Sequence, residues 1–267
     1  MIAEIFRATP EIARVSIARH VAYRAEMTIW ILTSTLPLIM LALWNAVAEE
    51  RGSVGGIGPA DMARYFAATL IVRQLTGVWL LWELNFEIRS GRLSSRLLRP
   101  FPVLWPYAVW MVTAIPFRAG VLAPIIVGLA LWRPDLLVWP GGPEAALFAA
   151  SVVLAFAINF LMQACFGALS FWVDKTDGLF GVWFALWSLL SGYVAPLSLL
   201  PAFWRDVSFW LPFRAMLATP VELLSGQLRA ADAGPAVAAQ IAWLGAFSLL
   251  FSVLWRRGLA RYGAFGA

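Results

Sequence analysis

The residues best suited to recognising another molecule lie in the segment EIRSGRLSSRLLRP, residues 87–100. Its four arginines, Arg89, Arg92, Arg96 and Arg99, follow one acidic residue, so they can attract anionic lipid or orient a contact with a partner. Leucines lie between them at helical spacing, which predicts a short amphipathic helix. Long apolar runs precede and follow the segment, so we expect it to be a loop between two apolar segments.

Residues for catalysis or metal binding are scarce. Cys165 is the only cysteine, so no intrachain disulfide can form, and His20 is the only histidine, which excludes a histidine cluster and counts against a Ser-His-Asp triad. The chain has no G-x-x-x-x-G-K-[ST] loop, and its single lysine, Lys175, is not in a glycine-rich turn. We therefore expect no catalytic residue, no metal site and no nucleotide-binding site in this chain.

Composition indicates a membrane protein. Hydrophobic residues make up 61% of the chain, charged residues only 13%, and the mean hydropathy is +0.78. Apolar runs long enough to cross about 30 Å of hydrocarbon recur along the chain. We expect an all-α, polytopic, single-domain protein over residues 1–267. The net charge of +5 is explained by arginines that flank the spans, so no nucleic-acid partner is expected.

The hydropathy pattern predicts six transmembrane helices. They cover Thr28–Val47, Met62–Leu84, Tyr107–Trp132, Ala145–Val173, Gly178–Leu200 and Ala236–Trp255. Basic residues are about twice as frequent on the side that carries residues 87–100 and both termini, which makes that side cytoplasmic. This arrangement is that of a multi-pass protein of a bacterial cytoplasmic (inner) membrane.

Three segments outside these spans also have a predicted form. Residues 1–27 alternate apolar and charged side chains at helical spacing, which predicts an interfacial amphipathic helix, broken near Pro10. The proline-punctuated stretch 201–226 predicts short helices that dip into the outer leaflet. Residues 28–255 form the six-span bundle and 256–267 a cytoplasmic tail.

Together these parts resemble the permease subunits of type-2 ATP-binding-cassette (ABC) exporters over nearly the whole chain. The resemblance is carried in the loop by Ile88, Gly91, Leu93, Leu97, Leu98, Arg99 and Pro100, with Ser94 where many relatives have an acid. Further along the chain it is carried by Gly192, Pro196, Leu197, Pro201, Leu211, Pro212, Phe213, Pro220 and Gly226, and in the tail by Trp255, Gly258, Leu259, Tyr262 and Gly266.

The resemblance implies a six-helix half-transporter whose loop at 87–100 is a coupling helix between spans two and three, with re-entrant outer helices before span six. The ATPase, with its ATP and Mg²⁺, would be another polypeptide present in two copies, and a second permease copy or a sister chain would complete the pathway. On the coupling helix, Leu93 and Leu97 would insert into a groove of the ATPase. Positive-inside bias alone would also place the arginines there.

Polar and aromatic residues inside the predicted spans are the candidates for a substrate path or a dimer interface. Arg73 and Gln74 lie at the middle of span two and must face the protein interior, as substrate ligand, as latch between permeases, or as a structural pair or carbonyl cap. Asn159 and Gln163 share a face of span four, where buried amides hydrogen-bond between helices as often as they contact cargo. Trp183 and Trp187 share a face of span five, where aromatics pack or line an apolar path.

The expected function is ATP-driven export of an amphipathic or hydrophobic substrate, such as a drug or lipid. Two alternatives remain open, an ion-coupled secondary transporter and a membrane scaffold that transports nothing. The first would need acidic residues at mid-membrane, and those of this chain fall at span ends or in loops.

Overall fold

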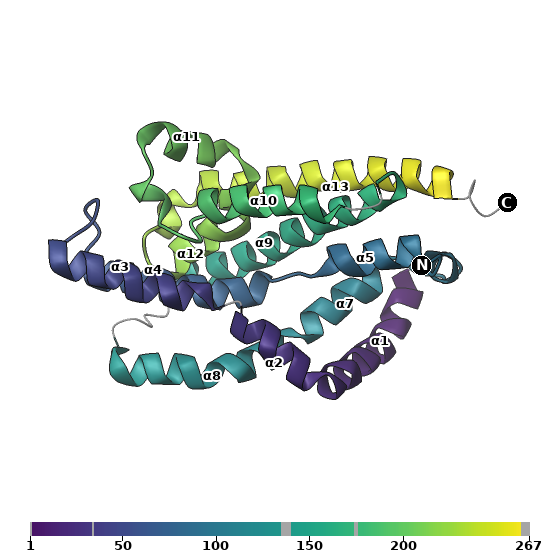
Figure 1. The fold of residues 1–267 in the computed structure, drawn as a ribbon, viewed down its shortest axis with the longest axis horizontal. Coiled ribbons are helices and arrows are strands. Elements are labelled where there is room, and N and C mark those ends of the chain that lie inside the picture. The colour runs from purple at the N-terminus through teal and green to yellow at the C-terminus, as the bar shows by residue number, and fades with distance from the viewer. Residues whose placement is uncertain (1, 34, 135–139, 174–175, 263–267) are drawn as a thin grey trace.

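The computed structural model describes residues 2–33, 35–134, 140–173 and 176–262, and these residues form helices with no β-strand among them (Figure 1). The α-helices are α1 (Ile2–Ala22), α2 (Arg24–Thr33), α3 (Leu36–Arg51), α4 (Pro59–Thr76), α5 (Leu80–Arg89), α6 (Leu93–Leu97), α7 (Trp105–Thr113), α8 (Ile115–Trp132), α9 (Gly142–Ala168), α10 (Asp177–Leu190), α11 (Ala202–Trp210), α12 (Thr219–Leu224) and α13 (Gly234–Tyr262). A π-helical turn, Arg214–Ala218, precedes α12.

Four helical stretches are long and apolar enough to cross a membrane. They are Pro59–Arg89, Trp105–Leu131, Gly142–Phe171 and Gly234–Tyr262, and they correspond to the second, third, fourth and sixth predicted spans. In Figure 1 the long helices lie side by side along the long axis, with α9 in the middle. The chain is therefore an all-helical, multi-pass type of membrane protein.

The other two predicted spans differ from the structure. The first is divided between α2 and α3, and Pro37 occupies the first turn of α3, where its missing N–H costs no helical bond. The fifth was predicted to reach Leu200, but α10 ends at Leu190. The chain turns at Gly192 with φ = +84°, and the Tyr65 hydroxyl donates to the Gly192 carbonyl over 2.8 Å. A Cβ atom there would lie 2.1 Å from the Tyr65 hydroxyl oxygen, so the turn requires glycine.

The predicted break near Pro10 is wrong: the segment 1–27 is instead divided at Tyr23, between α1 and α2. α1 continues through Pro10, which lies inside it. The indole nitrogen of Trp105 on α7 donates to the Thr9 hydroxyl over 2.9 Å, next to the proline, so α7 supports the helix at this point. α1 leaves the apolar side chains of Phe6 and Val15 exposed. Of the predicted tail, residues 263–267 lie outside the described part of the chain, including Gly266.

The stretch between α10 and α13 contains the short helices that the prolines predicted. α11 ends at Trp210, and Pro212 begins the next helical segment, which runs through the π turn into α12. Pro220 lies in the first turn of α12 and does not interrupt that segment, contrary to the prediction. The aromatic side chains of Phe203, Trp204 and Trp210 on α11 are exposed.

Candidate functional site

The predicted short helix between spans two and three is present as α6. It is shorter than predicted, because Ile88 and Arg89 complete α5 and the chain then turns at Gly91, with φ = +76°. Few residues other than glycine adopt this left-handed conformation, so Gly91 sets the angle between α5 and α6.

The apolar residues of this segment divide into a buried set and an exposed set. Ile88 and Leu93 are buried in a cluster with Leu84 and Tyr107, and Leu93 is 0% exposed. The prediction that Leu93 inserts into a partner is therefore wrong, because its side chain is already inside this chain's core. Leu97 is partly exposed and Leu98 is 87% exposed, so these two leucines form the apolar surface that a partner can reach.

The arginines of the segment have different surroundings. Arg96 donates to the Glu87 carboxylate over 2.5 Å, and its guanidinium lies 4.6 Å from the centroid of the Tyr107 ring, so it ties α6 to both α5 and α7. Arg92 lies over the Phe86 ring at 5.1 Å. The remaining predicted residues are on the exposed surface: Arg89, Arg99 and Pro100.

The segment also contacts the far end of the chain. The Ser94 hydroxyl on α6 lies 3.1 Å from the Tyr262 hydroxyl at the end of α13. Phe171, which follows α9, packs its ring against those of Trp255 and Tyr262. α5, α6, α7 and the ends of α9 and α13 therefore form one packed unit, which we call the α6 unit.

The stretch Pro59–Arg89 is not one continuous helix. α4 ends at Thr76 and α5 begins at Leu80, which leaves the backbone groups of residues 77–79 without helical partners. Inside a membrane such groups must be satisfied by protein. Arg118 on α8 donates through Nη1 to the carbonyls of Gln74 at 3.0 Å and Gly77 at 2.8 Å. It thus places a buried cation at the negative end of the α4 dipole.

Gln163 on α9 forms hydrogen bonds with backbone groups on the α5 side of this break. Its side-chain nitrogen donates to the Val78 carbonyl over 2.7 Å, and its oxygen accepts from the Leu81 N–H over 3.2 Å. The unwound residues are therefore held by α8 and α9 together. Of the two readings left open for Gln163, hydrogen bonding between helices is the one that these contacts show.

A cavity of about 440 Å³ lies beside this break, between α4–α5, α9 and α10. Five of the six residues predicted for a substrate path or dimer interface line it: Arg73, Asn159, Gln163, Trp183 and Trp187. The sixth, Gln74, is buried and is not among the lining residues. Residues from three separated parts of the sequence thus meet at one place.

Arg73 is the side chain of this cavity best placed to meet a ligand. Its guanidinium lies 5.3 Å from the Trp187 ring centroid and 6.0 Å from that of Tyr193. Within the described ranges no carboxylate lies at ion-pair distance from it, and its Nε has no hydrogen-bond partner. The amide groups of Asn159 and Gln163 instead donate to backbone carbonyls. The cavity therefore presents one cation amid aromatic rings.

Among the lining residues that sequence reasoning missed, three are aromatic residues from the break and from the turn after α10. Trp79 and Trp82 come from the break and the start of α5, and Tyr193 from the turn after α10. Gly77, a helix-weakening residue in the middle of an apolar run, was the signal that the chain unwinds there and exposes Trp79. No group of three or more His, Cys, Asp or Glu residues within the described chain is arranged to hold a metal ion.

Comparison with known proteins agrees with this architecture. No curated protein matches the chain. A family profile described as "ABC-2 family transporter protein" matches residues 34–266, which is most of the chain. Members of this family are membrane subunits that associate with an ABC ATPase. The chain belongs to the ABC-2 transporter family, as a permease subunit.

Proposed function

We propose that this chain is the permease subunit of an ATP-driven exporter that moves an amphipathic or hydrophobic substrate across the bacterial cytoplasmic membrane. The observation that carries the proposal is the cavity beside the α4–α5 break, where Arg73 lies among aromatic rings. Rings offer an apolar body a favourable contact, and an unpaired guanidinium suits a polar or anionic group on the same molecule.

The surface of the α6 unit supports the proposal that a separate ATPase drives transport. Leu97 and Leu98 offer an exposed apolar contact beside the exposed Arg89 and Arg99, as expected of a surface that docks an ATPase. Arg96 links α6 to Glu87 on α5 and to Tyr107 on α7. A force applied to α6 would therefore move α5 and α7 with it. α5 begins at the break and carries Trp82, which lines the cavity. ATP and Mg²⁺ would be bound by two copies of the partner ATPase.

The distribution of cationic side chains supports one orientation of the chain in the membrane. Ser94 and Tyr262 place α6 beside the end of α13, so the arginines of residues 87–100 and those at positions 256, 257 and 261 lie at the same end of the molecule. α1 begins at that end too (Figure 1). By the positive-inside rule this end would be cytoplasmic, together with both termini.

A second permease would complete the path. The cavity is bounded by one subunit on only some sides, and α10 exposes Leu179, Val182, Leu186 and Leu189 on its face away from the cavity. These side chains suit lipid or a second copy or sister chain. An ion-coupled transporter is less well supported, because Asp177, in the first turn of α10, is the only acidic residue among those that line the cavity.

Reconstitution tests the proposal. The permease would be co-expressed with its partner ABC ATPase, and ATP-dependent uptake of fluorescent amphiphiles would be measured in inverted membrane vesicles. We expect uptake that requires ATP hydrolysis and persists when the proton and sodium gradients are collapsed. Uptake that disappears with the ion gradients, at unchanged ATP, would favour the ion-coupled alternative.

A further inference from the structure

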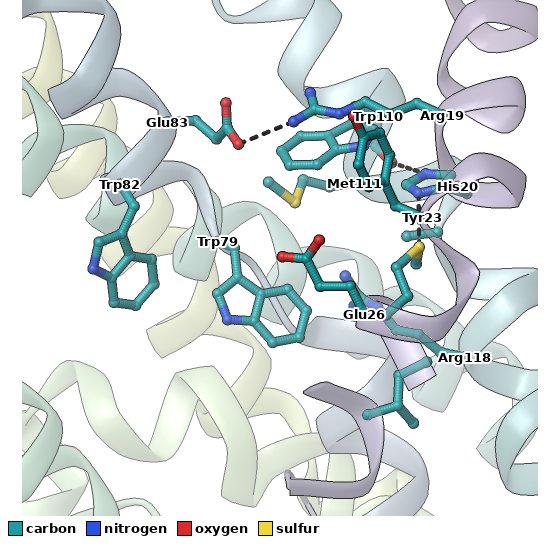
Figure 2. Close-up of a pocket in the computed structure, with 13 residues that line it drawn as sticks. Arg19, His20, Tyr23, Glu26, Trp79, Trp82, Glu83, Trp110, Met111 and Arg118 are labelled. Carbon is teal, nitrogen blue, oxygen red and sulfur yellow. Dashed lines mark hydrogen bonds and ion pairs between the residues drawn. The ribbon is translucent and has the colours of Figure 1, made fainter. Parts of the chain in front are cut away.

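A second cavity, of about 610 Å³, lies between α1–α2 and the helices α5, α7 and α8 (Figure 2). Trp79 and Trp82 line it on one side and also line the cavity of Arg73, so the break between α4 and α5 separates the two. This second cavity contains none of the residues predicted for the substrate path.

The charges in this cavity do not all pair with one another. Arg19 and Glu83 form an ion pair at 3.3 Å at its rim. This leaves Arg118 and Glu26, for neither of which the described residues provide an ion-pair partner. The Arg118 side chain is only 2% exposed and its Nε–H has no hydrogen-bond partner. In Figure 2 the Glu26 carboxylate points into the cavity between Trp79 and Trp110.

The tryptophan side chains that line the cavity favour binding of a phosphate group. Arg118 lies over the Trp79 ring at 4.9 Å and Arg19 over the Trp110 ring at 4.5 Å, so both guanidinium groups are held in place. The indole N–H of Trp110 is buried and also lacks a partner. Two donors, one of them cationic, therefore lack a partner; both atoms are buried, so an oxygen acceptor on a bound molecule reaches them only when the side chains that cover them move.

His20 supplies no further charge to this cavity. Its ring nitrogens contact the Met27 sulfur, the Trp110 carbonyl and the Thr113 hydroxyl. Burial lowers its pKa below the ordinary 6.5, an effect that nearby Arg118 and Arg19 add to, so the neutral form dominates at pH 7. The unpaired charges are thus one cation and one anion.

Depth and apolar surface match a lipid in the inner leaflet. Glu26 lies in the first turn of α2, just before the first predicted span, whereas Arg118 lies further along the third predicted span, past the start of α8. The apolar side chains of Met27, Ile31 and Met111 line the same cavity. In a phospholipid the ammonium of the head group lies closer to the water than the phosphate does. Glu26 likewise lies closer to the membrane surface than Arg118.

We propose that this cavity binds the head group of a phospholipid that carries both a phosphate and a primary ammonium, of the phosphatidylethanolamine kind. The phosphate would accept from Arg118 and Trp110, and the ammonium would donate to Glu26. A lipid with a net anionic head group would leave Glu26 unpaired, and a quaternary ammonium has no N–H to donate to it. The inference uses the proposed orientation in the membrane but not the proposed transport activity.

Lipid binding to the purified full chain in neutral detergent tests this proposal. Phosphatidylethanolamine, phosphatidylcholine and phosphatidylglycerol with identical acyl chains would be added in turn. Bound lipid would be counted by native mass spectrometry and affinity taken from the titration. The variant is Glu26→Gln, and Glu11→Gln on α1 is the matched control, because both glutamates are exposed and only Glu26 lines the cavity.

We expect the wild-type protein and Glu11→Gln to bind phosphatidylethanolamine roughly tenfold more tightly than the other two lipids. In Glu26→Gln this preference should disappear while phosphatidylglycerol binding is retained, which also shows that the variant is folded. Equal affinity of the wild type for all three lipids would overturn the proposal, as would a preference for phosphatidylglycerol or a preference that persists in Glu26→Gln. None of these outcomes depends on ATP or on the partner ATPase, so they do not bear on the transport proposal.

Discussion

The side-chain nitrogen of Asn159 lies 3.1 Å from the carbonyl oxygen of Met216. In a regular helix that oxygen would accept from the residue four positions later, but this residue is Pro220, which has no N–H. The π-helical turn before it frees a neighbouring carbonyl, that of Ala215, and Gln240 donates to it over 2.9 Å. Two amide side chains from α9 and α13 thus replace the backbone bonds that the turn and the proline remove.

Replacing Asn159 should therefore destabilise the protein in a way that depends on the proline. Asn159→Leu leaves the Met216 carbonyl unsatisfied in a buried place, which costs about 1–3 kcal/mol. In a Pro220→Ala background the new N–H can reach that carbonyl, so the same substitution should cost less. Thermal unfolding of the four proteins gives this double-mutant cycle. An equal cost of Asn159→Leu in both backgrounds would contradict the assignment.

A second stability prediction concerns the break between α4 and α5. Gln163→Leu removes the partners of both the Val78 carbonyl and the Leu81 N–H, so we expect a loss of about 2–4 kcal/mol, which lowers the unfolding temperature. The control is Gln227→Leu, at an exposed position between α12 and α13, which should change little. Similar unfolding temperatures for the two variants would show that other groups hold the break.

The sequence predicted the helices well where hydropathy alone decides them. The second, third, fourth and sixth spans follow from apolar runs, and the short helices around Pro212 follow from prolines. The end of α10 could not be found in this way, because the turn at Gly192 depends on a hydrogen bond from Tyr65, 127 residues away along the chain. Hydropathy likewise cannot show that residues 77–79 are unwound, since the residues that hold them are on α8 and α9.

The sequence identified most of the residues of the candidate site but not the role of each one. Polar residues in apolar spans must face protein, and for this reason Arg73, Asn159 and Gln163 were found. Which of them bonds to backbone and which meets the cavity depends on neighbours that sequence does not reveal. Leu93 illustrates the same limit. Its helical spacing with Leu97 predicted an exposed apolar face, but the turn at Gly91 rotates Leu93 into the core.

Acid should weaken the contact between α1 and α7 through His20. Burial lowers the pKa of the folded-state imidazole below 6.5, so the unfolded chain takes up a proton at a higher pH than the native protein does. The stabilising contribution is complete above about pH 6.5 and is lost as the pH falls through the folded pKa. Unfolding temperatures at pH 7.5 and 5.5 should therefore fall more in the wild type than in His20→Gln. The same decrease in both proteins would remove His20 as the cause.

Arg73 should be required for transport and not for insertion. Arg73→Leu removes the cation of the cavity and makes the span easier to insert, so membrane levels and unfolding temperature should be maintained. Transport of amphiphiles with an acidic or polar group should fall about tenfold or more. Arg73→Lys keeps the charge and the contact with the Trp187 ring and should retain part of the activity. Full transport by Arg73→Leu, with an intact permease dimer, would exclude both a ligand role and a latch between subunits.

Leu98 should be the apolar contact to the ATPase, in place of the buried Leu93. Leu98→Glu puts a carboxylate into a contact that must lose its water, so association with the ATPase should weaken about tenfold or more. The protein should remain folded, because the side chain is 87% exposed. The control is Arg257→Gln near the end of α13, which changes the net charge by the same amount at an exposed site. Co-purification and stimulated ATP hydrolysis would be measured for both variants, and normal values in Leu98→Glu would mean that α6 is a membrane-surface loop with no part in coupling.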